Sequence, residues 1–277
     1  MTATTSAPLP SPEAPPRFRH PLAAEWTKLW SLRSTPLLLG LGALVVIGVN
    51  VNAARSNAER LAEVPEAARG MFDPLGTAFV DPAWQLLMVV AACVGAVVVS
   101  GEYATGLAHT TFAAVPDRRA VVLAKAVVVT AVTLVLGAAV SLGSFGATQA
   151  LLRDHGGLSL ADPGAARAVV GSALLAPVCA LAGMAAGALV RHAAGSVVAA
   201  IGTLLLLPPL FQGETYRWVK EIGHLLPLTA WEALVRDPAR PVLEKYPVAV
   251  GEAWAVLGGW AVAGLVLAVP AVRHRDV

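Results

Sequence analysis

The sequence predicts an all-α integral membrane protein with six transmembrane helices, and two observations support this. First, 56% of the 277 residues are hydrophobic and only 14% are charged, with a mean hydropathy of +0.67, whereas soluble domains carry about 25% charged residues. Second, the charged residues leave six long gaps that contain no Asp, Glu, Lys or Arg. These gaps lie between Arg33 and Arg55, Asp81 and Glu102, Lys125 and Arg153, Arg167 and Arg191, Arg191 and Glu214, and Glu252 and Arg273.

Each gap has the length of a membrane-spanning helix, because roughly 20 apolar residues cross ~30 Å of hydrocarbon at ~1.5 Å per residue. Buried helices of a large soluble protein seldom run so long, and the sequence lacks the alternating pattern of β-barrel strands. We therefore expect a membrane domain over residues 35–272. Its spans are expected at about 35–54, 83–101, 121–151, 168–190, 193–212 and 253–272.

The basic residues predict which side of the membrane holds the termini. Six spans place both termini on one side, and the totals of Lys and Arg tie at ten on each side. On the side of the termini they sit in short stretches near helix ends, which is typical of the cytoplasmic face. Those residues are Arg17, Arg19, Lys28, Arg33, Arg118, Arg119, Lys125, Arg191, Arg273 and Arg275. Trp84 and Trp254 would then stand at the outer ends of the second and sixth spans, at headgroup level.

Three cytoplasmic segments lie outside the spans at the chain ends. Residues 1–20 are rich in Pro and have no apolar period, so we expect a disordered tail, and residues 273–277 form the cytoplasmic C-terminus. Residues 21–34 predict an amphipathic helix on the inner membrane surface. Its apolar residues at helical spacing are Leu22, Trp26, Leu29 and Trp30, and the charged residues on its other faces are Glu25, Lys28 and Arg33. A plain cytoplasmic extension of the first span is the alternative.

The segment 101–120, between the second and third spans, is too polar to cross a membrane. Its threonines, with His109, indicate a short and partly polar helix that ends near Pro116. Asp117, Arg118 and Arg119 follow in a turn that we expect to face the cytoplasm. We interpret this segment as a docking surface for a cytoplasmic partner.

On the outer side, residues 51–83 and 212–251 form long loops. The second loop has an apolar pattern before Pro227, made by Trp218, Ile222, Leu225 and Leu226. This pattern predicts short re-entrant or surface helices that cap the outer mouth. Pro208 and Pro209 predict a kink or break at the outer end of the fifth span.

Several kinds of chemistry have no motif in the sequence. It contains no Gly-x-x-x-x-Gly-Lys-Ser/Thr loop, His-Glu-x-x-His or Gly-x-Ser-x-Gly, so we expect no ATPase or other enzyme activity in this chain, no cofactor and no metal. No nucleic-acid partner is expected either. Ion-coupled transporters need ionisable groups near the midplane, and the gaps hold none; Lys125 is expected to snorkel to the interface. An external ATPase is therefore the favoured energy source.

Small residues predict close helix packing. Gly183 and Gly187 stand in a Gly-x-x-x-Gly spacing on the fourth span, and Gly137 precedes Ser141 on the third. Because Gly and Ala are abundant throughout, this motif is weak evidence for dimerisation.

Two stretches carry a resemblance to a known family. EWTKLWSLRSTPLLL (residues 25–39) and GEYATGLAHTTFAAVPDRRAVVLAKAVV (residues 101–128) resemble the bacterial type-2 ABC transporter permeases. The first matches their amphipathic helix and first span, and the second matches the segment after their second span. Weaker similarity in GALVRHAAGSV (187–197) and HLLPLTAWEAL (224–234) extends the resemblance over nearly the whole chain, and His109 departs from it where a basic residue is expected.

The resemblance implies a six-helix exporter subunit in a bacterial plasma membrane. It implies a homodimer or heterodimer of permeases, and a separate ABC ATPase subunit that binds ATP and Mg²⁺. The coupling loop toward that subunit would include Glu102, Tyr103, Thr105, Gly106, Asp117, Arg118 and Arg119, and the interface helix would include Glu25, Trp26, Lys28, Trp30 and Arg33. Lipids, hydrophobic drugs and peptide antibiotics all fit as substrates. A membrane scaffold or sensor subunit, and an ion-coupled transporter, are the alternative functions.

Overall fold

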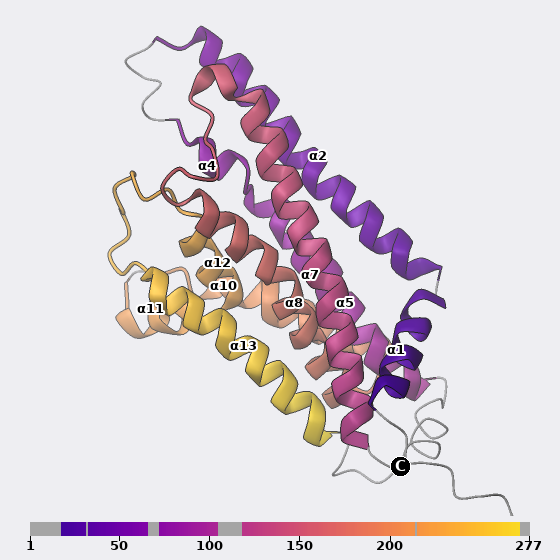
Figure 1. Cartoon of the computed structure of the whole chain (residues 1–277). Helices are drawn as coiled ribbons and strands as arrows, with labels where there is room; N and C mark the ends of the chain where they lie inside the picture. Colours follow the sequence, from indigo (N-terminus) through magenta and orange to yellow (C-terminus); the bar gives the residue numbers. More distant parts are fainter. Residues whose placement is uncertain (1–17, 32, 66–71, 105–117, 214, 272–277) are drawn as a thin grey trace, which may run out of the picture.

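The computed structural model describes residues 18–31, 33–65, 72–104, 118–213 and 215–271. Within these ranges the chain forms helices and no strand (Figure 1). The helices are α1 (Arg19–Ser31), α2 (Ser34–Glu63), α4 (Pro74–Thr77), α5 (Asp81–Ala104), α7 (Arg118–Leu151), η1 (Arg153–His155), α8 (Ala165–Val190), α9 (Ala193–Ile201), η2 (Gly202–Leu206), α10 (Leu207–Leu210), α11 (Arg217–His224), α12 (Pro227–Val235) and α13 (Val250–Ala271).

Six of the described helical segments are long and apolar enough to cross a membrane: α2, α5, α7, α8, the continuous run α9–η2–α10, and α13. Each covers one of the charge-free gaps, so the prediction of six apolar helices is confirmed. The first span is longer than the predicted 35–54, because α2 continues to Glu63 and has 30 residues. A helix of that length measures ~45 Å, and its last turns extend beyond a hydrocarbon layer of ~30 Å.

Successive spans run in opposite directions, so the start of α2 and the end of α13 lie toward the end of the bundle at which α1 is found (Figure 1). We call this the α1 end. The short helices α4, α11 and α12 lie at the opposite end, which we call the α12 end. This arrangement agrees with an even number of crossings.

Helix α8 forms the centre of the bundle, where it packs against α5, α7, α12 and α13. Glycines make these contacts close: a Cβ atom on Gly183 would lie 2.1 Å from the carbonyl oxygen of Ala92, and one on Gly137 would lie 2.2 Å from that of Ala173. Ser141 donates a 2.7 Å hydrogen bond to the carbonyl oxygen of Val169. The small residues predicted to allow close packing therefore act within this chain, between α8 and its neighbours α5 and α7.

Asn50, which is fully buried, connects three parts of the bundle. Its amide nitrogen donates to the hydroxyl of Ser144 on α7 at 3.1 Å, and its amide oxygen accepts a 3.0 Å bond from the backbone N–H of Val80 before α5. An amide inside an apolar bundle needs such partners, because an unsatisfied polar group there is costly. Asn50 thus fixes α2 to α7 and to the start of α5.

Trp84 does not have the interfacial role predicted for it. Its side chain is fully buried, with its ring centroid 5.5 Å from that of Phe79 and 5.7 Å from that of Trp231. The indole of Trp231 in turn donates a 2.8 Å hydrogen bond to Ser172 on α8. These aromatic rings join α5, α8 and α12, and Trp84 lies inside because α12 brings the ring of Trp231 against it.

The fifth span is irregular near its end, as Pro208 and Pro209 predict. Here the α-helix changes to the π-helix η2 before the short α10, and the chain then leaves the bundle at Phe211. Two short helices, α11 and α12, follow at the α12 end. Helices were expected in this loop, and their bounds now place Pro227 at the first position of α12, where its missing N–H costs no hydrogen bond.

Helix α1 begins at Arg19 and ends at Ser31, so it starts two residues before the predicted 21–34 and stops earlier. The predicted apolar face is divided between the protein interior and the surface. The residues that α1 buries are Pro21, Glu25 and Leu29, whereas the side chains of Trp26 and Trp30 are 50% and 41% exposed. Glu25 turns inward because two lysines are available there to neutralise it.

Candidate functional site

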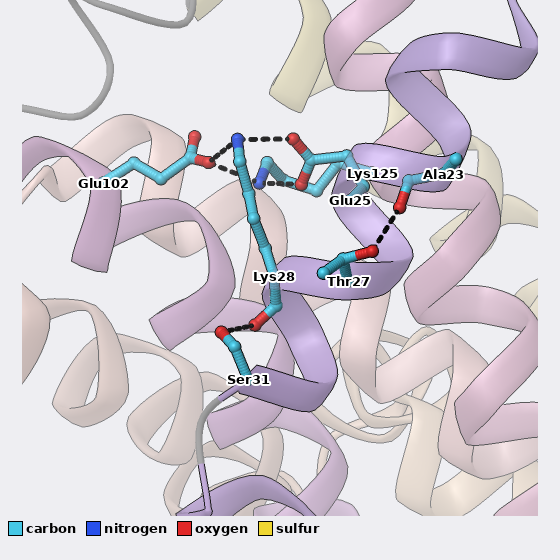
Figure 2. A network of polar contacts seen from close by, with 7 residues as sticks. All are labelled: Ala23, Glu25, Thr27, Lys28, Ser31, Glu102 and Lys125. Atoms are coloured by element: carbon cyan, nitrogen blue, oxygen red, sulfur yellow. Dashed lines mark hydrogen bonds and ion pairs between the residues drawn. The ribbon is translucent and has the colours of Figure 1, made fainter.

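Four charged side chains from three helices meet at the α1 end of the bundle (Figure 2). Glu25 and Lys28 lie three residues apart on α1, a spacing that places them on the same side of a helix. Glu102 comes from the last turn of α5, and Lys125 from the second turn of α7. We call these four residues the charge cluster.

The charges of the cluster alternate around a closed ring. Lys125 Nζ lies 2.5 Å from Glu25 Oε2 and 3.0 Å from Glu102 Oε1. Lys28 Nζ lies 2.8 Å from Glu25 Oε1 and 2.8 Å from Glu102 Oε1. Each lysine therefore contacts both carboxylates, and the ring is neutral overall. Helices α1, α5 and α7 are tied together at this point although the residues lie up to 100 positions apart.

The cluster is buried on one side and open on the other. The side chains of Glu25 and Lys125 are 3% and 6% exposed, Glu102 is 14% exposed, and Lys28 is 37% exposed. Burial lowers the pKa of Lys28, but the hydrogen bonds and charges of Glu102 and Glu25 outweigh it and raise the pKa above its ordinary value. Lys28 therefore stays charged at the accessible edge of the ring.

The expectation that Lys125 snorkels to the interface is wrong. Its ammonium group points into the protein, where Glu25 and Glu102 supply both charge and hydrogen bonds. A lysine that reaches the water surface avoids the cost of desolvating its charge. Inside the protein, two carboxylates within hydrogen-bond distance of the Lys125 ammonium group offset that cost. The sequence carried one signal of this pairing, namely a lysine inside an apolar helix with Glu102 near the end of the preceding one.

The two tryptophans of α1 stand beside an apolar groove of about 440 Å³ between α1, α2 and α7. Their ring centroids lie 5.7 Å apart. The other lining residues, all apolar, are Pro36, Leu39, Gly40, Ala43, Ala131, Val132, Val135, Leu136 and Ala139. The groove is open space beside α1, so α1 is held to the bundle by the charge cluster and by its buried Leu29.

Tyr103 and Arg191 form a second contact near the end of α5. The guanidinium carbon of Arg191 lies 5.1 Å from the centre of the Tyr103 ring, a cation–π distance. Arg191 follows α8 with a left-handed backbone, φ 56°, and its N–H donates to the carbonyl oxygen of Gly187. Arg191 was not among the predicted site residues, and only the tertiary fold brings it to Tyr103.

The other predicted site residues are not brought into the cluster. Arg33 and Arg119 are exposed. Arg118 begins α7, but its side chain lies outside the described residues, as do Thr105, Gly106 and Asp117. The predicted tail 1–20 is described only from residue 18, and 273–277 also lie outside the described part.

The charge cluster joins three helices at the α1 end of the bundle. No three described His, Cys, Asp or Glu residues are placed to hold a metal ion. The ring instead couples the position of α1 to the ends of α5 and α7, the two helices that flank the segment 105–117. A force applied to α1 would therefore reach two spans directly.

Comparisons with known proteins give no further guide: no protein-family model matches the chain, and no curated protein matches it.

Proposed function

We propose that this chain is the membrane-spanning subunit of an ATP-binding cassette exporter, driven by a separate ATPase. The observation that carries the proposal is the charge cluster, which joins a short helix outside the spans to the ends of two spans at one end of a six-helix bundle. The resemblance of residues 25–39 and 101–128 to type-2 ABC permeases supports it. In this proposal α1 is the interface helix, and the segment after Glu102 is the coupling loop.

The ring geometry supports a mechanism for this proposal. ATP binding would close the partner ATPase against α1 and the segment between α5 and α7. Because Glu25 and Lys28 hold α1 to both Glu102 and Lys125, movement of α1 would shift the ends of α5 and α7 together. The partner would bind ATP and Mg²⁺, since this chain has no phosphate-binding loop.

The lipid contacts and the orientation complete the proposal. Trp26 and Trp30 would lie at the inner headgroup level, where exposed indole rings are favoured. The α1 end would face the cytoplasm of a bacterial cell, and α11 and α12 would cap the outer mouth as re-entrant helices. The spans α2 and α13 bury little of their surface within the chain, which leaves faces for a second permease subunit, identical or different, and for lipid.

The charge-free stretches of the spans support a hydrophobic or amphipathic substrate. This substrate would move between two permease chains. The absence of a charged residue from the middle of the gaps favours ATP over an ion gradient as the energy source.

The test is co-expression of the full chain with an ABC ATPase encoded beside it, followed by purification in detergent and measurement of ATP hydrolysis in nanodiscs. We expect a stable complex whose ATPase rate depends on the chain. Lys28→Met, at the accessible edge of the ring, should change that rate several-fold while the complex still forms. Arg217→Ala is the matched control, because Arg217 is exposed at the α12 end and pairs only locally with Glu221 among the described residues.

Failure to form a complex with the ATPase would contradict the proposal and favour the scaffold or sensor role. Transport in sealed vesicles that stops when a proton gradient is collapsed, and continues without ATP, would favour an ion-coupled transporter instead.

A further inference from the structure

A second polar site lies at the α12 end, far along the bundle from the charge cluster. It is a cavity of about 270 Å³ formed by the end of the fifth span, by α11 and α12, and by the chain that follows α12. Its lining residues are Phe211, Gln212, Lys220, Gly223, His224, Thr229, Glu232, Arg236, Glu244 and Val248. Seven of these ten side chains can form hydrogen bonds, which is unusual for space inside an otherwise apolar helical protein.

The two cations of this cavity, Lys220 and Arg236, share one carboxylate, that of Glu244. Glu244 accepts a 2.7 Å hydrogen bond from Arg236 with one carboxylate oxygen, and its other oxygen lies 3.8 Å from Lys220 Nζ. The His224 ring nitrogen Nε2 lies 3.1 Å from the carbonyl oxygen of Tyr246. An anionic ligand would therefore have to displace Glu244 from its partners.

Three other lining groups have no such partner. Gln212, Thr229 and Glu232 make no hydrogen bond or ion pair with any residue in the described ranges. Thr229 and Glu232 lie three residues apart on α12, so both lie on the same side of the helix. The cavity thus offers one carboxyl, one hydroxyl and one amide to a guest, and the carboxyl is its unpaired charge.

The surroundings of Glu232 favour a cationic guest. Burial, together with the negative charges of Asp81 and Glu244, raises its pKa to about 7 against the opposing effect of Lys220 and Arg236. A positive charge beside Glu232 would reverse this effect by favouring the carboxylate. An ammonium group supplies that charge and also N–H donors for the carboxylate.

We propose that the cavity between α10, α11 and α12 binds a small primary ammonium compound, with its ammonium group on Glu232 and a neighbouring oxygen on Thr229 or Gln212. The volume is below that of drug-sized pockets, which begin near ~300 Å³, so the guest has few heavy atoms. A soluble amino alcohol and the ethanolamine headgroup of a lipid share this chemistry. The proposal does not rest on transport, because binding is measured directly and without an ATPase.

The experiment uses the full chain in phosphatidylcholine nanodiscs, titrated with ethanolamine by calorimetry. Choline is the control ligand, because its quaternary nitrogen has the same charge but no N–H donor. We expect ethanolamine to bind and choline to bind at least tenfold more weakly. Glu232→Gln should abolish ethanolamine binding, whereas Glu221→Gln, on the exposed side of α11, should leave it unchanged.

The pH dependence of ethanolamine affinity tests the same site in the wild-type chain. This measurement needs no variant, so it holds even if Glu232→Gln folds poorly. A carboxyl with a pKa of about 7 is roughly one-tenth ionised at pH 6 and nine-tenths at pH 8, so affinity should rise about tenfold over that range. The charged and titratable groups around Glu232 are Lys220 and His224 from α11, Arg236 and Glu244 after α12, and Asp81 at the start of α5. Because histidine also changes charge near neutral pH, His224→Asn should retain the rise.

The source of the ammonium group is decided by adding phosphatidylethanolamine to the nanodiscs. Weaker apparent binding of soluble ethanolamine there would identify the lipid headgroup as the guest, and equal binding would identify a soluble amine. No ethanolamine binding in either membrane, or binding that Glu232→Gln leaves unchanged, would overturn the proposal and leave the cavity as a water-filled space.

Discussion

Glu25 shows how strongly one residue's role depends on its surroundings. In the sequence it stands between alanine and tryptophan on a short helix, where a glutamate ordinarily faces water. In the structure its side chain is 3% exposed and lies 2.5 Å from Lys125. A buried ion pair of this kind contributes little net stability, but loss of one partner is expensive because the other charge stays behind uncompensated.

The ring makes a specific prediction about Lys28 and Glu102. Lys28→Met leaves the cluster with one excess negative charge, and Glu102→Gln leaves one excess positive charge. The double variant is neutral and keeps the pair of Glu25 with Lys125. We expect the two effects to be non-additive by about 0.5–1 kcal/mol in the free energy of unfolding, a discounted value because Lys28 is partly exposed. The free energy of unfolding is measured by denaturant in detergent for the wild type, the two single variants and the double variant. Additive effects would contradict a closed ring.

Glu232 predicts how stability depends on pH. Its pKa is raised from 4.5 to about 7 by burial, with smaller contributions from Asp81 and Glu244. Between these pH values the folded chain binds more protons at Glu232 than the unfolded chain, so the contribution of this group to stability falls as pH rises from about 4.5 to about 7. Glu232→Gln should therefore stabilise the protein at pH 8 and not at pH 4, as measured by thermal unfolding.

A matched comparison for this pH effect is Glu221→Gln, since Glu221 is an exposed carboxylate on the neighbouring helix α11. That variant should leave the slope of stability against pH unchanged. Equal slopes for wild type and Glu232→Gln would show that Glu232 does not titrate near neutral pH.

At the scale of helices, small residues decide how the spans approach one another. Helix α8 has its largest contacts with α5 and α7. At Gly183 and Gly137, the backbone of the neighbouring helix occupies the space that a Cβ atom on the glycine would need. In lipid, helices associate through close packing rather than through the hydrophobic effect. The Gly-x-x-x-Gly spacing at Gly183 and Gly187 is consequently used inside the chain and is not left free for a partner.

The glycines of α8 and α13 provide a matched test of this packing. A Cβ atom on Gly183 would lie 2.1 Å from the Ala92 carbonyl oxygen, whereas one on Gly259 would meet nothing within 4 Å. Gly183→Ala should lower the free energy of unfolding by about 1–3 kcal/mol through overpacking, and Gly259→Ala should be neutral or stabilising by up to ~1 kcal/mol. Equal thermal stabilities for the two variants would contradict the close contact of α5 with α8.

At the scale of the whole molecule, the bundle has two different polar ends. The α1 end carries the charge cluster, with two carboxylates and two lysines in a closed ring. The α12 end carries a hydrogen-bonding cavity beneath two short helices. The spans between them are apolar, so any coupling of the two ends must pass through movement of helices rather than through a line of charges.

The six-helix arrangement predicts opposite accessibility for the two ends. In cells that express Arg33→Cys or Arg217→Cys, an impermeant maleimide should label Cys at 217 in intact cells and Cys at 33 only after permeabilisation. Both sites are exposed, and the wild-type chain is the background control because Cys93 is half-buried and Cys179 is buried. Labelling from the same side would contradict six crossings, and the reverse pattern would place the α1 end outside.

The sequence by itself determined that the chain has six apolar helices. About 20 consecutive uncharged, mostly apolar residues have the length of a membrane-spanning helix, and such stretches are rare in other kinds of structure. It also located the α1 segment, the two short helices near Pro227 and the irregular end of the fifth span. Hydrophobic length and proline are local properties, so they can be read along the chain.

Only the tertiary structure decided which side chains meet. The pairing of Glu25 with Lys125, the contact of Tyr103 with Arg191, the burial of Trp84 and the unpaired position of Glu232 each depend on residues far apart in sequence. A charged or aromatic side chain has two stable positions near a membrane. It either faces the headgroups or lies inside the protein against partner side chains. The partners brought by other helices decide between them, and the order of residues along one helix does not contain that information.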